Sequence, residues 1–472
     1  MGNIEFKREA GEKAIKIRLI SGSLSHFTGE ELFVATGHAI SKETASKTKE
    51  PLLSRRKMVI LTRKVVALAK QNKIKEFEVE WKDIRKLADK KIDDAELGTL
   101  VATAFLMANY EHTSYKTVTK SFVGVEAVAV LDASLPAQRG LERGQTIGTE
   151  VNACRRLCNT PGGDMTPEAL ANAAAKAAEG TGVKVKVLGR AEMERLGMGA
   201  VLGVAKGSAE EPQFIIAEYW GTDRTKKPIV LVGKGVTFDT GGLNIKPGDH
   251  MYEMHMDMSG GAAVIHAVVL AAKLGVKNNV IALVPAVENN PGGSAMRPGD
   301  ILTSMSGKTI EILNTDAEGR VILADALTYA KKYSPTAVVD VATLTGAALT
   351  CLGQVASAFM TNKDSFVPTM MELAETSGDY VWPFPLWDEY DPMVKGDFAD
   401  VPNLSTMGNS RYGGVIAGGK FLEVFAKELD CLWVHIDMAP RMTSYSGEYL
   451  AKGAAGAPVR LLLEFIESAK VK

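Results

Sequence analysis

The sequence lacks the features that mark several special classes of protein. It has only four cysteines, Cys154, Cys158, Cys351 and Cys431, and no CxxC pair. This excludes a disulfide framework and a zinc knuckle, and it predicts reduced, buried thiols. There is no basic excess either, since 55 Lys and Arg stand against 56 Asp and Glu for a net charge of −1. Proteins that neutralise many phosphates usually carry such an excess, so nucleic acid is not the expected partner.

Long hydrophobic runs and targeting signals are also missing. The longest apolar stretch, 262–272, contains His266 and is too short to span a bilayer. The opening MGNIEFKREAGEK lacks the apolar core of a signal peptide, and Phe6 stands where a myristoylation signal has Ser or Thr. We therefore expect a cytoplasmic protein with no membrane partner.

Length and composition indicate an ordinary globular chain. Its 472 residues are 46% hydrophobic and 24% charged, which suits two domains or one very large one. A helical stretch at 144–159 stops at the breaker Thr-Pro-Gly-Gly of 160–163. We predict an N-terminal domain at 1–143, a connecting helix at 144–163 and a C-terminal domain at 164–472.

The order of the hydrophobic runs predicts an α/β fold. The runs that resemble strands are 13–21, 31–37, 124–133, 183–189, 214–220, 228–233, 279–288 and 336–344. The helical patterns are 97–110, 144–159, 166–180, 260–275 and 319–333. We expect a smaller N-terminal α/β domain and a larger domain with a central, mostly parallel sheet flanked by helices. Ligands of such sheets bind beyond the carboxyl ends of the strands.

Charged residues follow or precede apolar runs in three segments of the larger domain. They are Lys234, Asp239 and Lys246 after the run at 228–233, Asp257 before the helix at 260–275, and Asp316, Glu318 and Arg320 before the helix at 319–333. Taken singly, the acidic residues are typical of helix N-termini. Four carboxylates at one sheet edge, however, repel each other unless cations neutralise them. Such a cluster suits Mg²⁺, Mn²⁺ or Zn²⁺, and two ions sharing a water form a hydrolytic centre.

Lys234 has two interpretations. A buried amine near two cations loses its proton more easily and can then bind a metal. It can equally form a salt bridge with a neighbouring carboxylate. Histidine-based zinc sites do not apply, because the sequence contains no HExxH motif.

Six motifs resemble the leucine (cytosol) aminopeptidase family. They are VGKGVTFDTGGLNIKP, MHMDMSGGAA, PAVENNPGGSAMRPGD, NTDAEGRVILADAL, VATLTGA and YLAKGAAGAPVRLL. Their order and spacing cover nearly all of 160–472, and NTDAEGR is highly specific; the N-terminal domain has no matching motif. The resemblance implies a metal-dependent aminopeptidase. Such an enzyme hydrolyses the N-terminal residue, preferably leucine-like, from short peptides by means of a hydroxide that bridges two metal ions.

The resemblance also implies roles for individual residues. One divalent ion, Mn²⁺, Zn²⁺ or Mg²⁺, has the ligands Lys234, Asp239, Asp257 and Glu318; the other has Asp239, Asp316, Glu318 and the Asp316 carbonyl. Lys246 is the catalytic lysine, and Arg320 holds a bicarbonate ion that relays protons. Met254, Thr343, Leu344 and Gly346 bind substrate. The family's assembly is a homohexamer, with active sites facing an internal cavity.

Some segments depart from the family pattern or resemble other sites. His255 stands where Lys or Tyr is more usual, and HIDMAP ends in Pro440 instead of a small residue. GVIAGGK at 414–420 imitates a phosphate loop but continues with Phe421, so we expect a flexible glycine-rich segment. The aromatic residues of 381–390 suggest core or subunit contact.

Two rival functions stay open at this point. One is a DNA-binding or assembly role, alongside or in place of peptidase activity. The other is a dinuclear phosphoesterase or amidohydrolase, which is disfavoured because such enzymes usually use several histidines as ligands.

Overall fold

The computed structural model describes residues 4–11, 13–20, 24–36, 52–117, 124–409 and 412–469. The chain forms two compact units, which are residues 1–152 with 444–452, and residues 153–443 with 453–472. Each unit is built on a parallel-rich sheet with helices, so the predicted α/β class with a smaller and a larger part is confirmed. The domain limits predicted at 143 and 164 remain a prediction.

The first unit contains a six-stranded sheet in the order β1-β6-β5-β2-β4-β3, parallel except for the β3–β4 pair. Its strands are β1 (Glu5–Lys7), β2 (Ile15–Ile20), β3 (His26–Phe27), β4 (Glu31–Ala35), β5 (Glu76–Glu80) and β6 (Ala127–Leu131). Its helices are α1 (Arg55–Gln71), α2 (Trp81–Leu87) and α3 (Asp94–Asn109). Alternation in β5 directs Phe77 and Val79 into the core, where the helices cover them.

The helix α4 (Leu135–Cys158) begins well before the predicted start at 144. Ser134 accepts the N–H of Ala137 at 3.3 Å and so caps the true N-terminus. Glycines in the first half of α4 lower its helix propensity, but they allow this helix to pack closely against α3. A Cβ on Gly140 would lie 2.1 Å from the carbonyl oxygen of Ala95. Sequence propensity alone therefore placed this helix start too late.

The second unit contains a nine-stranded sheet in the order β16-β15-β18-β14-β9-β11-β8-β7, with β10 added beside β11. Strand β8 pairs antiparallel with both β7 and β11, and β15 pairs antiparallel with β18. The other pairs are parallel. The strands are β7 (Lys184–Leu188), β8 (Gln213–Trp220), β9 (Ile229–Gly233), β10 (Gly235–Asp239), β11 (Asn279–Asn289), β14 (Ala337–Ala342), β15 (Ser357–Thr361), β16 (Val381–Pro383) and β18 (Leu432–Asp437). A small sheet joins β12 (Ile301–Thr303), β13 (Thr309–Glu311) and β17 (Val401–Pro402).

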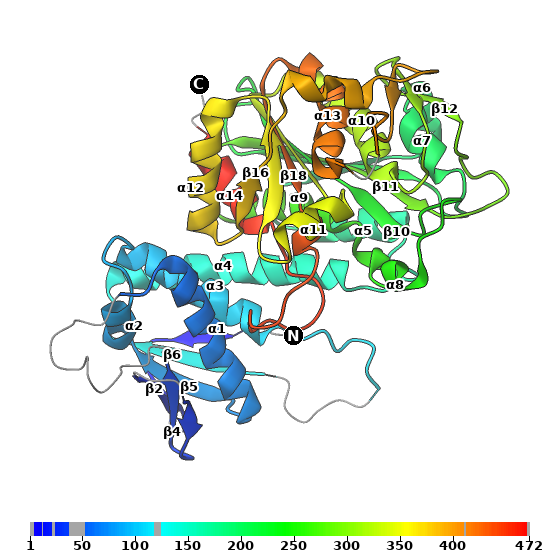
Figure 1. Cartoon of the computed structure of the whole chain (residues 1–472). Coiled ribbons are helices and arrows are strands. Elements are labelled where there is room, and N and C mark those ends of the chain that lie inside the picture. Colours follow the sequence, from blue (N-terminus) through cyan, green and yellow to red (C-terminus); the bar gives the residue numbers. More distant parts are fainter. Residues whose placement is uncertain are drawn as a thin grey trace. The chain divides into compact units, whose positions relative to one another are not determined.

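Helices cover both faces of the large sheet (Figure 1). On one face α9 (Ser259–Lys273) packs on β9 and β14 and against α14 (Val459–Ser468). On the other, α10 (Glu318–Ala330) packs on β9 and β11 beside α7 (Gly199–Ala205) and α13 (Gly414–Ala426). The remaining α-helices of this unit are α5 (Pro167–Ala178), α6 (Arg190–Arg195), α8 (Gly248–Met251), α11 (Gly346–Leu352) and α12 (Val367–Ser377). Double coverage explains why β9 and β14 are buried along their whole length.

Two sequence predictions in this unit are wrong. The segment 414–420 belongs to α13 and is not a flexible loop, because its glycines allow close helix packing; a Cβ on Gly419 would lie 2.4 Å from Met360 Sδ. Its lysine, Lys420, is buried and pairs with Asp391 and Glu423. Among the thiols, Cys154 and Cys158 are buried as predicted, whereas Cys351 is exposed.

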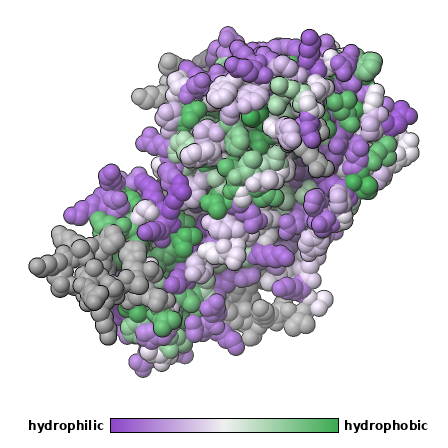
Figure 2. Space-filling view, in the orientation of Figure 1, coloured by the Kyte–Doolittle hydropathy of each residue, from purple (hydrophilic) through white to green (hydrophobic). Residues whose placement is uncertain are grey.

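The surface of the larger unit has polar and apolar areas, and hydrophobic residues gather on part of the face seen in Figure 2. Its exposed aromatic residues include Trp382, Trp387, Phe398 and Tyr412. One helical stretch, Gly248–Lys273, is long and apolar enough to cross a membrane, but 89% of its most apolar window is buried inside the protein, as in a core helix.

Candidate metal centre

Lys234 lies between β9 and β10, where strand and helix backbones approach closely. Its N–H donates to the carbonyl of Val341 at 2.9 Å, and its own carbonyl accepts the N–H of Gly261 at 2.7 Å. Gly260 permits this approach, since a Cβ there would lie 2.2 Å from the Val341 oxygen. The side chain is only 4% exposed. These backbone contacts fix a buried ammonium at the carboxyl edge of the sheet.

Asp257 precedes α9 and follows the short 3₁₀ helix Met254–Met256. Its Oδ1 accepts the hydroxyl of Thr343 at 2.7 Å, and its Oδ2 lies 2.7 Å from Lys234 Nζ. Lys234 Nζ also donates to the Thr343 carbonyl at 3.0 Å. The end of β14 therefore orients both the acidic and the basic group.

Asp316 and Glu318 occupy the turn that leads into α10. The side chain of Asn314 accepts the N–H of Asp316 at 2.7 Å, and the Thr315 hydroxyl donates to the carbonyl of Gly241 at 2.6 Å. Glu318 is the first residue of the helix, and its side chain is 1% exposed. The partial positive charge of a helix N-terminus stabilises a carboxylate in this position. The turn thus presents two acidic groups towards the segment that carries Asp239.

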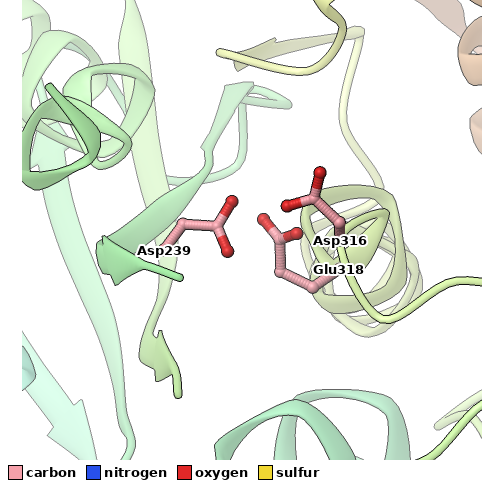
Figure 3. Close-up of side chains that lie close together, drawn as sticks. All are labelled: Asp239, Asp316 and Glu318. Carbon is pink, nitrogen blue, oxygen red and sulfur yellow. The ribbon is translucent and has the colours of Figure 1, made fainter. Parts of the chain in front are cut away.

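The three segments converge on one cluster of charges. Lys246 Nζ lies 2.8 Å from Asp239 Oδ2 and 2.5 Å from Asp316 Oδ1, and Lys234 Nζ lies 2.8 Å from Glu318 Oε1. Asp239, Asp316 and Glu318 each offer one oxygen within 4.8 Å of the other two. Figure 3 shows these three carboxylates pointing towards one another. The structure therefore brings the five predicted ligands and Lys246 together.

The acidic groups perturb one another. Burial, followed by the negative charge of Asp239, raises the pKa of Glu318 to about 8. Burial also raises the pKa of Asp257 and of Asp316, although the neighbouring lysines oppose this shift. The protein alone therefore resists full ionisation of the cluster, as expected of groups that need a cation.

The two lysines are also perturbed. Burial favours the neutral amine of Lys234, but the charges of Asp257, Glu318 and Asp239 outweigh burial and raise its pKa above the ordinary value. The pKa of Lys246 is raised in the same way, against its burial, by the charges of the cluster. Lys234 therefore forms the ion pair that the sequence allowed as one of two interpretations.

The donor set fits divalent metal ions. The buried oxygens Asp257 Oδ2, Asp316 Oδ1 and Glu318 Oε1 receive no well-directed hydrogen bond from the part of the chain that the structure describes, although a lysine nitrogen lies near each of them. Their lone pairs can therefore serve as metal ligands. Carboxylate oxygens with one nitrogen suit Mn²⁺ and Zn²⁺.

Arg320 lies in the first turn of α10 and is 5% exposed. Its Nε is buried and has no hydrogen-bond partner among the described residues. Burial lowers the pKa of Arg320 to about 10, against the nearby charges of Asp437 and Glu318, so the guanidinium stays charged at neutral pH. A buried cation with an unused donor fits a small anion such as bicarbonate.

Two of the four predicted substrate-binding residues, Met254 and Thr343, contact the predicted ligand Asp257. Met254 begins the 3₁₀ turn before Asp257, and its carbonyl accepts the Asp257 N–H at 3.4 Å. Leu344 follows β14, and Gly346 is the first residue of α11. The hydroxyl of Thr343 donates a hydrogen bond to Asp257 Oδ1, so this side chain orients a predicted ligand.

Sequence reasoning assigned no role to Asn289 and Asp437, which the structure places at this edge. Asp437 ends β18, is fully buried, and accepts the N–H of Leu344 at 3.1 Å and the hydroxyl of Thr345 at 2.6 Å. Asn289 ends β11 and contacts Asp239. The sequence feature that could have identified them is a polar residue at the end of an apolar strand, which is Asp437 in HIDMAP and Asn289 in PAVENN.

Most of the chain matches known proteins. The model of the cytosol aminopeptidase family, catalytic domain, matches residues 152–463. A protein named probable cytosol aminopeptidase from Azoarcus sp. (strain BH72) is 47% identical over 330 residues, which are 70% of this chain and 64% of that protein. The one from Syntrophotalea carbinolica is 44% identical over 375 residues, or 78% and 74% of the two chains. The aligned part thus spans slightly less than two thirds of the length of the Azoarcus protein.

The fold is also similar to that of a solved structure. The bottromycin maturation enzyme BotP in complex with Mn superposes with a TM-score of 0.83 at 28% sequence identity. The match covers 97% of this chain and 99% of BotP, so it includes both compact units.

Proposed function

The chain belongs to the cytosol aminopeptidase family, and on this basis we propose that it is a metal-dependent aminopeptidase. Its proposed reaction is hydrolysis of the N-terminal residue, preferably leucine-like, from short peptides. The observation that carries the proposal is the convergence of four carboxylates and two lysines, from three chain segments, at the carboxyl edge of the large sheet. This cluster lies entirely within the matched residues 152–463.

The proposed centre holds two divalent ions. Lys234 would bind one of them with Asp239, Asp257 and Glu318, after the charge of the metal ions has displaced the proton of its amine. Asp239, Asp316 and Glu318, with the Asp316 carbonyl, would bind the other. Mn²⁺ or Zn²⁺ fits the donor set, and Mg²⁺ is a further candidate. Mn is present in the BotP structure, which supports manganese for this chain by similarity. Such ions, when bound, supply a Lewis acid and lower the pKa of a water molecule.

The side chains around the ligands have distinct proposed tasks. Lys246 is 14% exposed, so it can reach a substrate while it pairs with Asp239 and Asp316. Its ammonium would donate a hydrogen bond to the carbonyl oxygen as negative charge develops there. Arg320 would hold bicarbonate, and such an anion would supply a general base and acid at this position. Met254, Leu344 and Gly346 would contact the substrate.

The assembly and location are also proposals. Family membership suggests a soluble, cytoplasmic protein and a homohexamer. The exposed side chains of Trp382, Trp387, Phe398 and Tyr412 support subunit contacts, since large exposed apolar groups often mark interfaces. The family and the names of the relatives support peptidase activity, and none supports the DNA-binding or assembly role.

Hydrolysis of leucine amide tests the proposal. The purified protein should release leucine, lose this activity on chelation and regain it when Mn²⁺ or Zn²⁺ is added. N-acetyl-leucine amide is the matched control and should resist cleavage, because its amine is blocked. Activity that ignores chelation, or equal cleavage of both amides, would contradict the proposal.

A further inference from the structure

Asn289 is the last residue of β11 and is 2% exposed. It pairs in register with Asp239, the last residue of the neighbouring parallel strand β10. Its carbonyl accepts the N–H of Thr240 at 3.0 Å and the hydroxyl of Thr240 at 2.7 Å. Backbone pairing therefore fixes the Asn289 side chain directly beside a predicted metal ligand.

The Asn289 amide also reaches the second acidic segment. Its Nδ2 donates to Asp239 Oδ1 at 2.8 Å and to the carbonyl of Thr315 at 3.0 Å, and it lies 3.4 Å from Glu318 Oε2. An amide has two N–H groups. The short contacts with Asp239 and Thr315 therefore use both N–H groups. The longer contact with Glu318 is weaker, because it shares one of these N–H groups.

The contacts divide the carboxylate oxygens in a regular way. Asp239 Oδ2 pairs with Lys246, and Asp239 Oδ1 accepts from Asn289 and from the N–H of Gly241 at 2.9 Å. Glu318 Oε1 pairs with Lys234, and Glu318 Oε2 contacts Asn289. Asp239 and Glu318 are the two carboxylates proposed as shared ligands. Among the described residues, Asn289 is the uncharged side chain that hydrogen-bonds to both of them.

A neutral amide suits this position. A third cation would compete with the metal ions, and another carboxylate would repel the four that are present. Three acceptors surround Nδ2, so the amide orientation follows from the hydrogen bonds. On the opposite side, a Cβ on Gly242 would lie 2.9 Å from Asn289 Oδ1. Gly242, with φ of +65°, thus lets the chain fold tightly over the amide.

We propose that Asn289 is a positioning residue that fixes the orientation of the shared carboxylates Asp239 and Glu318, so that two metal ions bind as a coupled pair. This inference rests on the proposed function. Loss of the amide should leave the ligands in place but loosen the orientation of both carboxylates, since Asp239 Oδ1 would keep only the N–H of Gly241 and Glu318 Oε2 would lose its contact with Nδ2. Partners that orient metal ligands typically contribute about 10–100-fold to metal affinity. We therefore expect the affinity for one of the two ions to fall by that factor.

The test uses Asn289→Leu, which keeps the shape and removes the donors, and Asn289→Ser, whose hydroxyl is too short to reach both carboxylates. Asn290→Ala is the matched control, because the Asn290 side chain donates to Glu288 and, among the described residues, contacts no predicted ligand. Each full-length protein is stripped by chelation and titrated with Mn²⁺. Binding is followed by calorimetry, and the spin coupling of the ions by electron paramagnetic resonance.

Wild type and Asn290→Ala should bind two ions and give a coupled-pair spectrum, whereas both Asn289 variants should bind one ion about 10–100-fold more weakly and lose the coupled signal. If either folded Asn289 variant keeps the coupled spectrum and both affinities within twofold of wild type, Asn289 has no positioning role. In that case the proposed function stands. A wild type that binds no ion pair would overturn both proposals.

Discussion

Lys234 Nζ lies 2.8 Å from Glu318 Oε1, and this contact joins the strand side of the cluster to the helix side. Both side chains are almost fully buried. The same nitrogen lies 2.7 Å from Asp257, so one ammonium holds two acidic groups that would otherwise repel each other. The consequences for function can be tested one side chain at a time.

Removing a carboxylate from the cluster should abolish turnover and leave the fold intact. Asp257→Asn and Glu318→Gln keep the side-chain shape but weaken metal binding. A hydrolytic metal supplies several kcal/mol of transition-state stabilisation, so kcat/KM should fall by on the order of 10³-fold or more. Glu288→Gln is the control, because Glu288 is also buried near this edge but bonds to Ser208 and Asn290. Full activity in either ligand variant, with the circular dichroism spectrum unchanged, would refute the ligand assignment.

Lys246→Met should act mainly on kcat. The ammonium stabilises charge that develops only in the transition state, and loss of one such donor costs about 10²–10³ in rate. Steady-state kinetics on leucine amide should therefore show a large fall in kcat with little change in KM. Lys308→Met, which removes a lysine paired with Glu428 away from the cluster, should behave like wild type. A change confined to KM would instead assign Lys246 to substrate binding.

Arg320→Met should make the rate of hydrolysis independent of added bicarbonate. The buried guanidinium has an unused donor, and a bound bicarbonate would act as a general base and acid, a contribution of about 10²–10⁴ in rate. In degassed buffer, added bicarbonate should speed up the wild type but not the variant. If bicarbonate changes both rates equally, Arg320 does not hold the anion.

Asp325 should make stability depend on pH. It is fully buried on α10, and its two oxygens accept the N–H groups of Val201 at 2.9 Å and Met305 at 2.7 Å. Burial raises the pKa of Asp325 to about 7, from an ordinary value of 3.8. The folded state therefore binds the proton more tightly, and the stability that this group contributes falls as pH rises from about 4 to about 7.

Asp325→Asn removes this titration. The free energy of unfolding of the wild type minus that of the variant should decrease between pH 5 and pH 7, by up to about 1.4 kcal/mol per pH unit, and level off above pH 7. Denaturant unfolding at several pH values measures this difference, because other titrating groups cancel. A difference that is constant or rises with pH would show that Asp325 is ionised in the folded protein throughout.

The sequence predicted the fold class because the strands of the larger unit are continuous apolar runs. It also predicted which residues meet, since Asp257 and the Asp316–Glu318 turn each precede a helix at the carboxyl edge of the same sheet. It did not predict the start of α4, where glycines that serve close packing resemble helix breakers. Nor did it predict the contacts of Asn289, because strand ends identify neighbours but not which hydrogen bonds their side chains form.

We propose that five side chains hold two metal ions between them. Crystals of the protein grown with Mn²⁺, with anomalous diffraction recorded at the manganese absorption edge, test it most directly. We expect two anomalous peaks enclosed by Lys234, Asp239, Asp257, Asp316 and Glu318. Peaks bound elsewhere on the chain, with Lys234 still paired to Asp257 and Glu318 at full Mn²⁺ occupancy, would contradict it.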